Sequence, residues 1–261
     1  MTESTAERPP LRIALVQAAA ALEPSENRAA LQRLYPADAD LVVFPEAFAR
    51  DFGAPGSDVS PYAEPTDGPF AAALTAAAGA TSTAVAGMFE IGTDPVRPFN
   101  TLLVRGRVAS AYRKIHLYDS FGYRESDRLT AGTLEPTLVD VNRWRVGLMT
   151  CYDLRFPELA RALVDRGAEV LVLPAAWVAG PGKIDHWRTL LTARAIENTV
   201  YVAAAGQPAP RYCGTSLVID PMGRVLAEAG PEEETVIRAV ADAEVLAQAR
   251  RTNPSLANRR L

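Results

Sequence analysis

LVVFPE at residues 41–46 and VLVLPAA at residues 170–176 share one pattern, a short apolar run that is closed by a proline. Runs of this length between turn signals are typical of buried strands. A second pair of similar segments follows, RGRVASAYRK at residues 105–114 and PMGRVLAEAG at residues 221–230, and each is typical of a β-hairpin. The sequence therefore predicts a chain built from two similar halves.

Outward from these segments, strands alternate with alanine-rich helices, which is the pattern of a layered α/β fold. In the first half, strands are predicted at 13–17, 41–44 and 83–91, helices at 25–34 and 69–80, and a hairpin around 105–107. In the second half, strands are predicted at 146–150, 170–173 and 199–205, helices at 157–166 and 184–198, and a hairpin over 216–228. Ser25 is the expected N-cap of the first helix.

The two β-α-β-α-β-hairpin halves are predicted to stack into one α/β domain. We expect this domain to span residues 11–241, after a flexible leader at residues 1–10. Residues 242–261 are expected to form a helix at 243–251 and a polar tail, which is either disordered or lies on a partner subunit.

Composition excludes several classes of protein. The chain has 261 residues, 48% hydrophobic and 22% charged, which is typical of a globular domain rather than of a disordered chain. Its net charge of −4, with scattered basic residues, argues against nucleic-acid binding. No apolar run reaches the roughly 18–20 residues that span a bilayer. The polar leader and only two cysteines predict free thiols in the cytoplasm.

Three reactive residues stand at strand ends, where functional groups of α/β folds gather. Glu46 follows the strand at 41–44, Lys114 closes the first hairpin, and Cys151 follows the strand at 146–150. Glu46 and Lys114 belong to the first half and Cys151 to the second. The seam between the halves is therefore the predicted site.

Cys151 is the candidate nucleophile, because a helix start near Pro157 places it at the positive end of a helix dipole. That position predicts a lowered thiol pKa. Glu46 is the candidate base, and Lys114 can stabilise a developing oxyanion. His116 or His186 is the alternative base. A buried, inert cysteine and a zinc site are further alternatives, although no zinc-type ligand spacing occurs.

Three motifs carry a family resemblance. FPEAF (44–48), YRKIHL (112–117) and TCYDLRFPEL (150–159) together resemble the nitrilase superfamily of carbon–nitrogen hydrolases, and the likeness runs from about Leu11 to Ala241. The resemblance implies a four-layer α-β-β-α sandwich that forms a homodimer.

The resemblance also implies roles for the matching residues. Glu46 matches the general base, Lys114 the oxyanion-stabilising lysine and Cys151 the nucleophile. Glu125 resembles a second glutamate near the site, and the backbone N–H of Tyr152 resembles the second oxyanion donor.

The cysteine motif most resembles the ω-amidase and deaminated glutathione amidase branch, which implies an amidase for a small non-peptide carboxamide. No metal or organic cofactor is expected. Arg155 and Arg124 are candidates to bind a substrate carboxylate, and Trp177 and Phe121 are candidate pocket walls. An N-carbamoyl amine amidohydrolase, a nitrilase and a non-catalytic partner-binding protein remain alternative functions.

Overall fold

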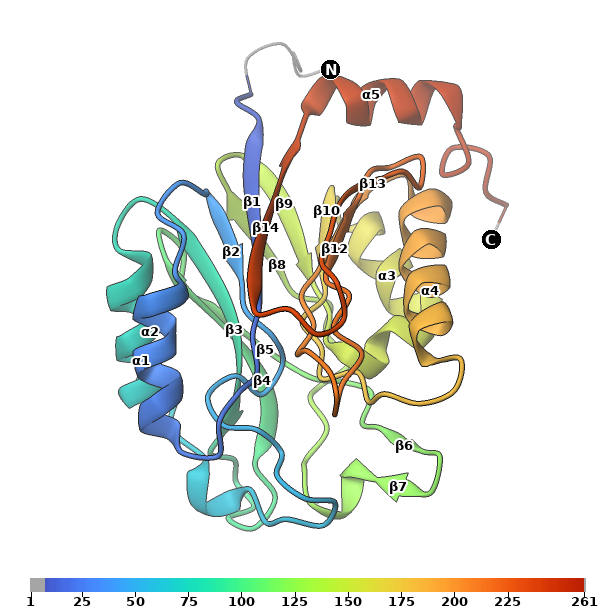
Figure 1. Ribbon diagram of the computed structural model, residues 1–261. Helices are drawn as coiled ribbons and strands as arrows, with labels where there is room; N and C mark the ends of the chain where they lie inside the picture. The colour runs from blue at the N-terminus through green and yellow to red at the C-terminus, as the bar shows by residue number, and fades with distance from the viewer. Residues whose placement is uncertain (1–7, 261) are drawn as a thin grey trace.

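Two sheets of six strands form the centre of the part of the chain that the computed structural model describes, residues 8–260 (Figure 1). The first sheet has the order β14 (Thr235–Ala241), β1 (Leu11–Gln17), β2 (Leu41–Val43), β3 (Thr83–Glu90), β4 (Phe99–Gly106), β5 (Ser110–Arg113). The second sheet has the order β13 (Val225–Glu228), β12 (Leu217–Ile219), β11 (Tyr201–Ala204), β10 (Val170–Val172), β9 (Trp144–Leu148), β8 (Leu138–Val141).

The two sheets repeat one topology, which confirms the two predicted halves. In the first, β1, β2 and β3 are parallel and β4 and β5 continue the sheet as antiparallel strands. In the second, β9, β10 and β11 are parallel and β12 and β13 are antiparallel. The two proline-closed runs are the equivalent central strands β2 and β10.

Both faces of the first sheet are buried, because its side chains alternate between two cores. On β1, Ile13 and Leu15 pack in the core that also contains the second sheet, whereas Ala14 and Val16 pack in the core beneath the first pair of helices. These helices are α1 (Pro24–Leu34) and α2 (Pro69–Ala78). The second sheet is covered by α3 (Pro157–Asp165) and α4 (Lys183–Asn198). The result is the predicted α-β-β-α sandwich (Figure 1).

The observed ends of α1 and α2 differ from the predicted ends. Ser25 is not the N-cap of α1, because the helix begins at Pro24 and Glu23 occupies the cap position. Proline fits there, since the first helical N–H has no partner within the helix. The second helix ends two residues before the predicted Ala80, because Gly79 turns the chain with a φ of +58°.

The ends of the described chain pack on the second half. Residues 1–7 of the predicted leader lie outside the described residues, but Arg8 forms a 2.6 Å ion pair with Glu169 and lies over the Trp144 ring. At the other end, Asp242 caps α5 (Ala243–Thr252). The tail then returns to its own chain through an Arg259–Asp165 ion pair of 2.5 Å. No helix among the described residues is long and apolar enough to cross a membrane.

Candidate active site

Glu46 is held at the end of β2 by an unusual turn of the backbone. Ala47, the next residue, has a φ of +53°. A Cβ atom at Gly87 on the neighbouring strand would lie 2.3 Å from the Ala47 nitrogen and 2.7 Å from the Glu46 Cα atom. Only glycine allows this close approach. The turn buries the Glu46 side chain almost completely, at 1% exposure.

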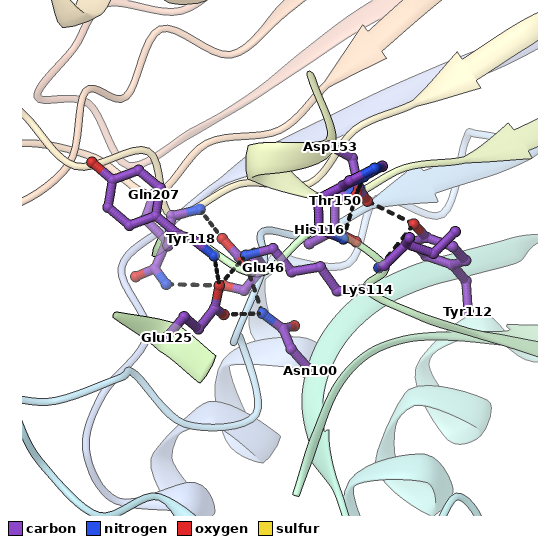
Figure 2. A network of polar contacts seen from close by, with 12 residues as sticks. Glu46, Asn100, Tyr112, Lys114, His116, Tyr118, Glu125, Thr150, Asp153 and Gln207 are labelled. Atoms are coloured by element: carbon purple, nitrogen blue, oxygen red, sulfur yellow. Dashed lines mark hydrogen bonds and ion pairs between the residues drawn. The ribbon is translucent and has the colours of Figure 1, made fainter. Parts of the chain in front are cut away.

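Lys114 bridges two carboxylates in this buried space. Its Nζ atom donates to Glu46 Oε1 at 3.0 Å and to Glu125 Oε2 at 2.8 Å, and all three side chains are buried (Figure 2). Burial acts to lower the pKa of Lys114, but the charges of Glu125 and Glu46 outweigh it and raise that pKa well above its usual value. The ammonium is therefore charged at neutral pH.

Further donors fix both carboxylates. Asn100 Nδ2 donates to Glu46 Oε1 at 2.8 Å and to Glu125 Oε1 at 3.2 Å. The backbone N–H of Ala176 donates to Glu46 Oε2 at 2.7 Å, and that of Tyr118 donates to Glu125 Oε2 at 2.6 Å. Since Ala176 follows β10 of the second sheet, its contact with Glu46 brings residues of the two halves together.

Cys151 begins a short 3-10 helix, Cys151–Arg155, after β9. Its φ of +46° is rare for a residue with a side chain, and its N–H donates to the Pro174 carbonyl at 2.9 Å. The side chain is 7% exposed and borders the same cavity as Glu46 and Lys114.

The predicted lowering of the Cys151 pKa is wrong. Burial, followed by the negative charge of Glu46, raises the pKa of this thiol well above its usual value, although Lys114 opposes the rise. The field of a helix dipole fades within one turn, whereas burial and the charges of two nearby carboxylates act directly on the sulfur. The free protein therefore holds Cys151 as a thiol at neutral pH.

The two histidines have partners other than Cys151. His116 Nδ1 lies 2.7 Å from Asp153 Oδ1, and its ring stacks on Phe156 at a centroid distance of 3.8 Å. His186 is exposed and lies 3.4 Å from an Arg155 nitrogen. The geometry thus favours Glu46 over either histidine as the base.

A cavity of about 830 Å³ opens onto the three central residues. Glu125, Trp177 and Phe121 line it, as does Lys183, which the sequence analysis did not single out. Arg155 is not among the lining residues, and its guanidinium carbon lies 4.9 Å from the Trp177 ring centre.

Two other predicted site residues, Arg124 and Tyr152, do not line this cavity. Arg124 is not among the lining residues, since its side chain is 70% exposed and faces Asp127 at 3.5 Å. Tyr152 follows the nucleophile and is half-buried, with its ring edge-on to Tyr118 at 5.0 Å.

Sequence reasoning missed Asn100 and Lys183. The rarity of lysine could have identified Lys183, because Lys114 and Lys183 are the only two lysines in the sequence. Both line the cavity. Asn100 had no signal except its polar side chain inside an apolar strand. In the described part of the chain, no group of three His, Cys, Asp or Glu side chains is arranged to hold a metal ion.

A cysteine, a glutamate and a lysine, all buried, line one cavity on this sandwich, and the fold and sequence are those of a carbon–nitrogen hydrolase of the nitrilase superfamily. The sequence matches the carbon-nitrogen hydrolase family over residues 12–251, and the chain belongs to that family.

Known proteins share the sequence and the fold. The deaminated glutathione amidase of Escherichia coli O157:H7 is 47% identical over 173 residues, 66% of this chain and 66% of that protein. A CN-hydrolase superfamily protein from Xanthomonas campestris, solved with an arsenic adduct in its active site, is 31% identical with a TM-score of 0.86 over 97% of this chain and 98% of that one. A mutant amidase from Nesterenkonia sp. AN1, solved with the acetamide moiety of fluoroacetamide added covalently to its active-site cysteine, is 26% identical with a TM-score of 0.75 over 95% of this chain and 96% of that one.

Proposed function

We propose that this protein is a cysteine-dependent amidase, which hydrolyses a small non-peptide carboxamide to a carboxylic acid and ammonia through a thioester. One observation supports this proposal above the others. Lys114 stands between Glu46 and Glu125 at hydrogen-bond distance and lines the same cavity as Cys151. The similarity to amidases, one with a covalent adduct on its cysteine, is consistent with it.

Acylation begins with a proton transfer from the Cys151 thiol to the Glu46 carboxylate. The resulting thiolate attacks the amide carbon, and the carbonyl oxygen becomes an oxyanion. Lys114 and the backbone N–H of Tyr152 stabilise this charge. Glu46 then gives its proton to the leaving nitrogen, the carbon–nitrogen bond breaks, and ammonia leaves a thioester on Cys151.

Deacylation uses the same groups in reverse. Glu46 takes a proton from water, and the hydroxide attacks the thioester carbon. The carbon–sulfur bond breaks, the acid is released, and the proton returns from Glu46 to the Cys151 sulfur. Glu125 holds Lys114 in place for both steps, because their 2.8 Å contact fixes the ammonium.

The deciding experiment measures ammonia release from a panel of short ω-amides, N-carbamoyl amines and nitriles, with identification of the organic product. An acid with the unchanged carbon skeleton from the amides supports the proposal. Preferred turnover of carbamoyl compounds or nitriles would assign the same residues to the alternative hydrolases. No turnover and no acyl-enzyme, with the fold intact, would favour a partner-binding protein.

We further propose that the protein is a cytoplasmic homodimer. The two cysteines, both buried and unpaired in the described structure, suit a reducing compartment. Light scattering, which measures the mass in solution, tests the homodimer. Fractionation of the source cells tests the cytoplasmic location.

A further inference from the structure

Two segments from different halves of the chain line the cavity and touch each other. Residues 52–55 come from the connection between β2 and α2, whereas Arg211 and Tyr212 come from the connection between β11 and β12. The backbone of the second segment is fixed to its own half, since the Ala179 N–H donates to the Arg211 carbonyl at 3.1 Å. Residues 52–55 belong to no helix or strand. Side-chain contacts therefore set their place relative to the second segment.

Asp51 supplies these contacts. Its Oδ1 atom accepts from Arg211 Nη1 at 2.6 Å and from the Gly53 N–H at 2.8 Å. Its Oδ2 atom accepts from the Tyr212 hydroxyl at 2.7 Å. The Arg211 guanidinium also donates to the Gly53 carbonyl, so the two segments are joined directly as well. One carboxylate thus connects the wall segment of the first half to that of the second.

Asp51 is a fixed anchor for both segments. Its side chain is buried, and hydrogen bonds to a charged group that is shielded from water are strong. Its own backbone is held on both sides, because its N–H donates to the Ala21 carbonyl at 3.1 Å and its carbonyl accepts from Arg50 Nη1 at 2.8 Å. Burial and the charge of Asp51 raise the pKa of Tyr212 above its ordinary value, so this hydroxyl remains a donor.

Asp51 itself does not line the cavity. A change at Asp51 therefore reaches a bound molecule only through the two segments that it connects. We propose that Asp51 is a positioning residue, which holds these two wall segments together and thereby fixes the shape of the cavity that receives the substrate. This inference rests on the proposed amidase function, because it takes the cavity beside Cys151 as the substrate site.

The proposal predicts an effect on substrate binding rather than on the chemical step. Glu46 is held by contacts that do not involve Asp51, namely those with Lys114, Asn100 and the Ala176 N–H. These contacts should survive when the wall segments separate. Loss of the Asp51 carboxylate is therefore expected to raise KM and to leave kcat nearly unchanged.

The test uses Asp51→Asn, because an amide has one acceptor oxygen and turns an NH2 group toward one of the donors that the carboxylate now accepts from. Hydrogen–deuterium exchange, read by peptide mass spectrometry, should become about 10- to 100-fold faster in residues 51–57 and 208–213 and stay unchanged in the central strands. KM for succinamate and glutaramate, two short ω-amides, should rise by about 3- to 30-fold. We expect kcat to stay within about threefold of the wild-type value.

Asp40→Asn is the matched control. Asp40 is similarly buried and also accepts three hydrogen bonds, all from Arg12, but it precedes β2 and so lies at the other end of this strand from Glu46. This variant should lose stability to urea without a change in KM or in the exchange of the two wall segments.

Two further measurements separate the positioning role from its foundation. Tyr212→Phe removes only one of the contacts and should accelerate the same exchange by a smaller factor, which decides the matter if Asp51→Asn does not fold. Binding of glutaramate to Cys151→Ala, measured by calorimetry with and without Asp51→Asn, requires no turnover. If the wild-type protein hydrolyses no amide, the amidase proposal fails, while exchange and calorimetry still decide the role of Asp51. Unchanged exchange in both segments, equally faster exchange throughout the chain, or unchanged KM and binding would overturn that role.

Discussion

His116 Nδ1 lies 2.7 Å from Asp153 Oδ1, and this contact ties the strand segment that carries Lys114 to the turn that carries Cys151. Asp153 is fully buried and also accepts from the Tyr112 hydroxyl at 2.7 Å and from the Thr150 N–H at 2.8 Å. Tyr112 and His116 stand two residues on either side of Lys114. The carboxylate therefore sets the distance between the proposed oxyanion donor and the nucleophile.

Asp153→Asn should lower both stability and turnover, because an amide cannot accept from every donor that now faces the carboxylate. We expect a loss of about 1–3 kcal/mol in unfolding free energy, from buried donors left without partners, and a fall in kcat with little change in KM. Tyr112→Phe, which removes one hydroxyl, is the matched control and should cost less. Urea titration and initial rates measure the two effects.

His116→Ala distinguishes positioning from base catalysis. The stacked ring on Phe156 and the bond to Asp153 predict a loss of stability with only a moderate loss of kcat. The pH profile of kcat should keep its shape. Abolished turnover at unchanged stability would restore the histidine-base mechanism.

Lys114→Met should remove an oxyanion donor and also leave Glu46 and Glu125 buried without a counter-charge. The first effect predicts a fall in kcat of about 100- to 1,000-fold. The second predicts a loss of about 3–5 kcal/mol in unfolding free energy at neutral pH. Urea unfolding measures the loss of stability, and initial rates measure the fall in kcat. A stability equal to that of the wild-type protein would contradict the two ion pairs of Lys114.

The repeat made most of the fold predictable, because both halves carry the same apolar runs, prolines and hairpins. The strands β14 and β8 were missed. The apolar residues of β14 are interrupted by Arg238, and the strand's partner β1 lies at the opposite end of the chain. Short-range patterns do not encode such a pairing.

The site was predictable only where motifs mark it. Glu46, Lys114 and Cys151 each lie in a distinctive run of residues, whereas Asn100 and Lys183 do not. The direction of the Cys151 pKa shift depends first on burial of the thiol and then on the charge of Glu46, and only the folded chain produces both. A local argument from the following helix therefore gave the opposite sign.

Glu46→Gln should make Cys151 more reactive while it stops turnover. The Glu46 charge helps to raise the pKa of the thiol, whereas Lys114 lowers it, so loss of that charge should increase the thiolate fraction at pH 7.5. Alkylation by a neutral reagent, followed by mass spectrometry in a Cys213→Ser background, should be faster than in the wild-type protein. Ammonia release should fall to background because no base remains. Slower alkylation would show that Glu46 already draws the proton away in the free protein.

Glu125→Gln should also accelerate the alkylation of Cys151, but by less than Glu46→Gln does. Glu125 contributes less than Glu46 to the raised pKa of Cys151, so alkylation should accelerate less. Hydrolysis should fall because Lys114 loses its 2.8 Å partner, but Glu46 remains to act as the base. Wild-type hydrolysis in this variant would assign Glu125 to holding the loop at Tyr118 alone.

Of the two thiols, Cys151 and Cys213, only Cys151 should carry the acyl group. Burial raises the pKa of Cys213 as well, and its sulfur faces the Val178 carbonyl at 3.8 Å rather than a base. Neither thiol is therefore ionised at neutral pH in the free protein. The two should differ in acylation, which requires substrate. During turnover of a slow amide or ester, acid quenching and peptide mass spectrometry should find the acyl group on the peptide that carries Cys151. Cys151→Ala should abolish the adduct and turnover, whereas Cys213→Ser should keep most of both. An acyl group on Cys213 would refute the proposed mechanism, since that thiol has neither Glu46 nor Lys114 beside it.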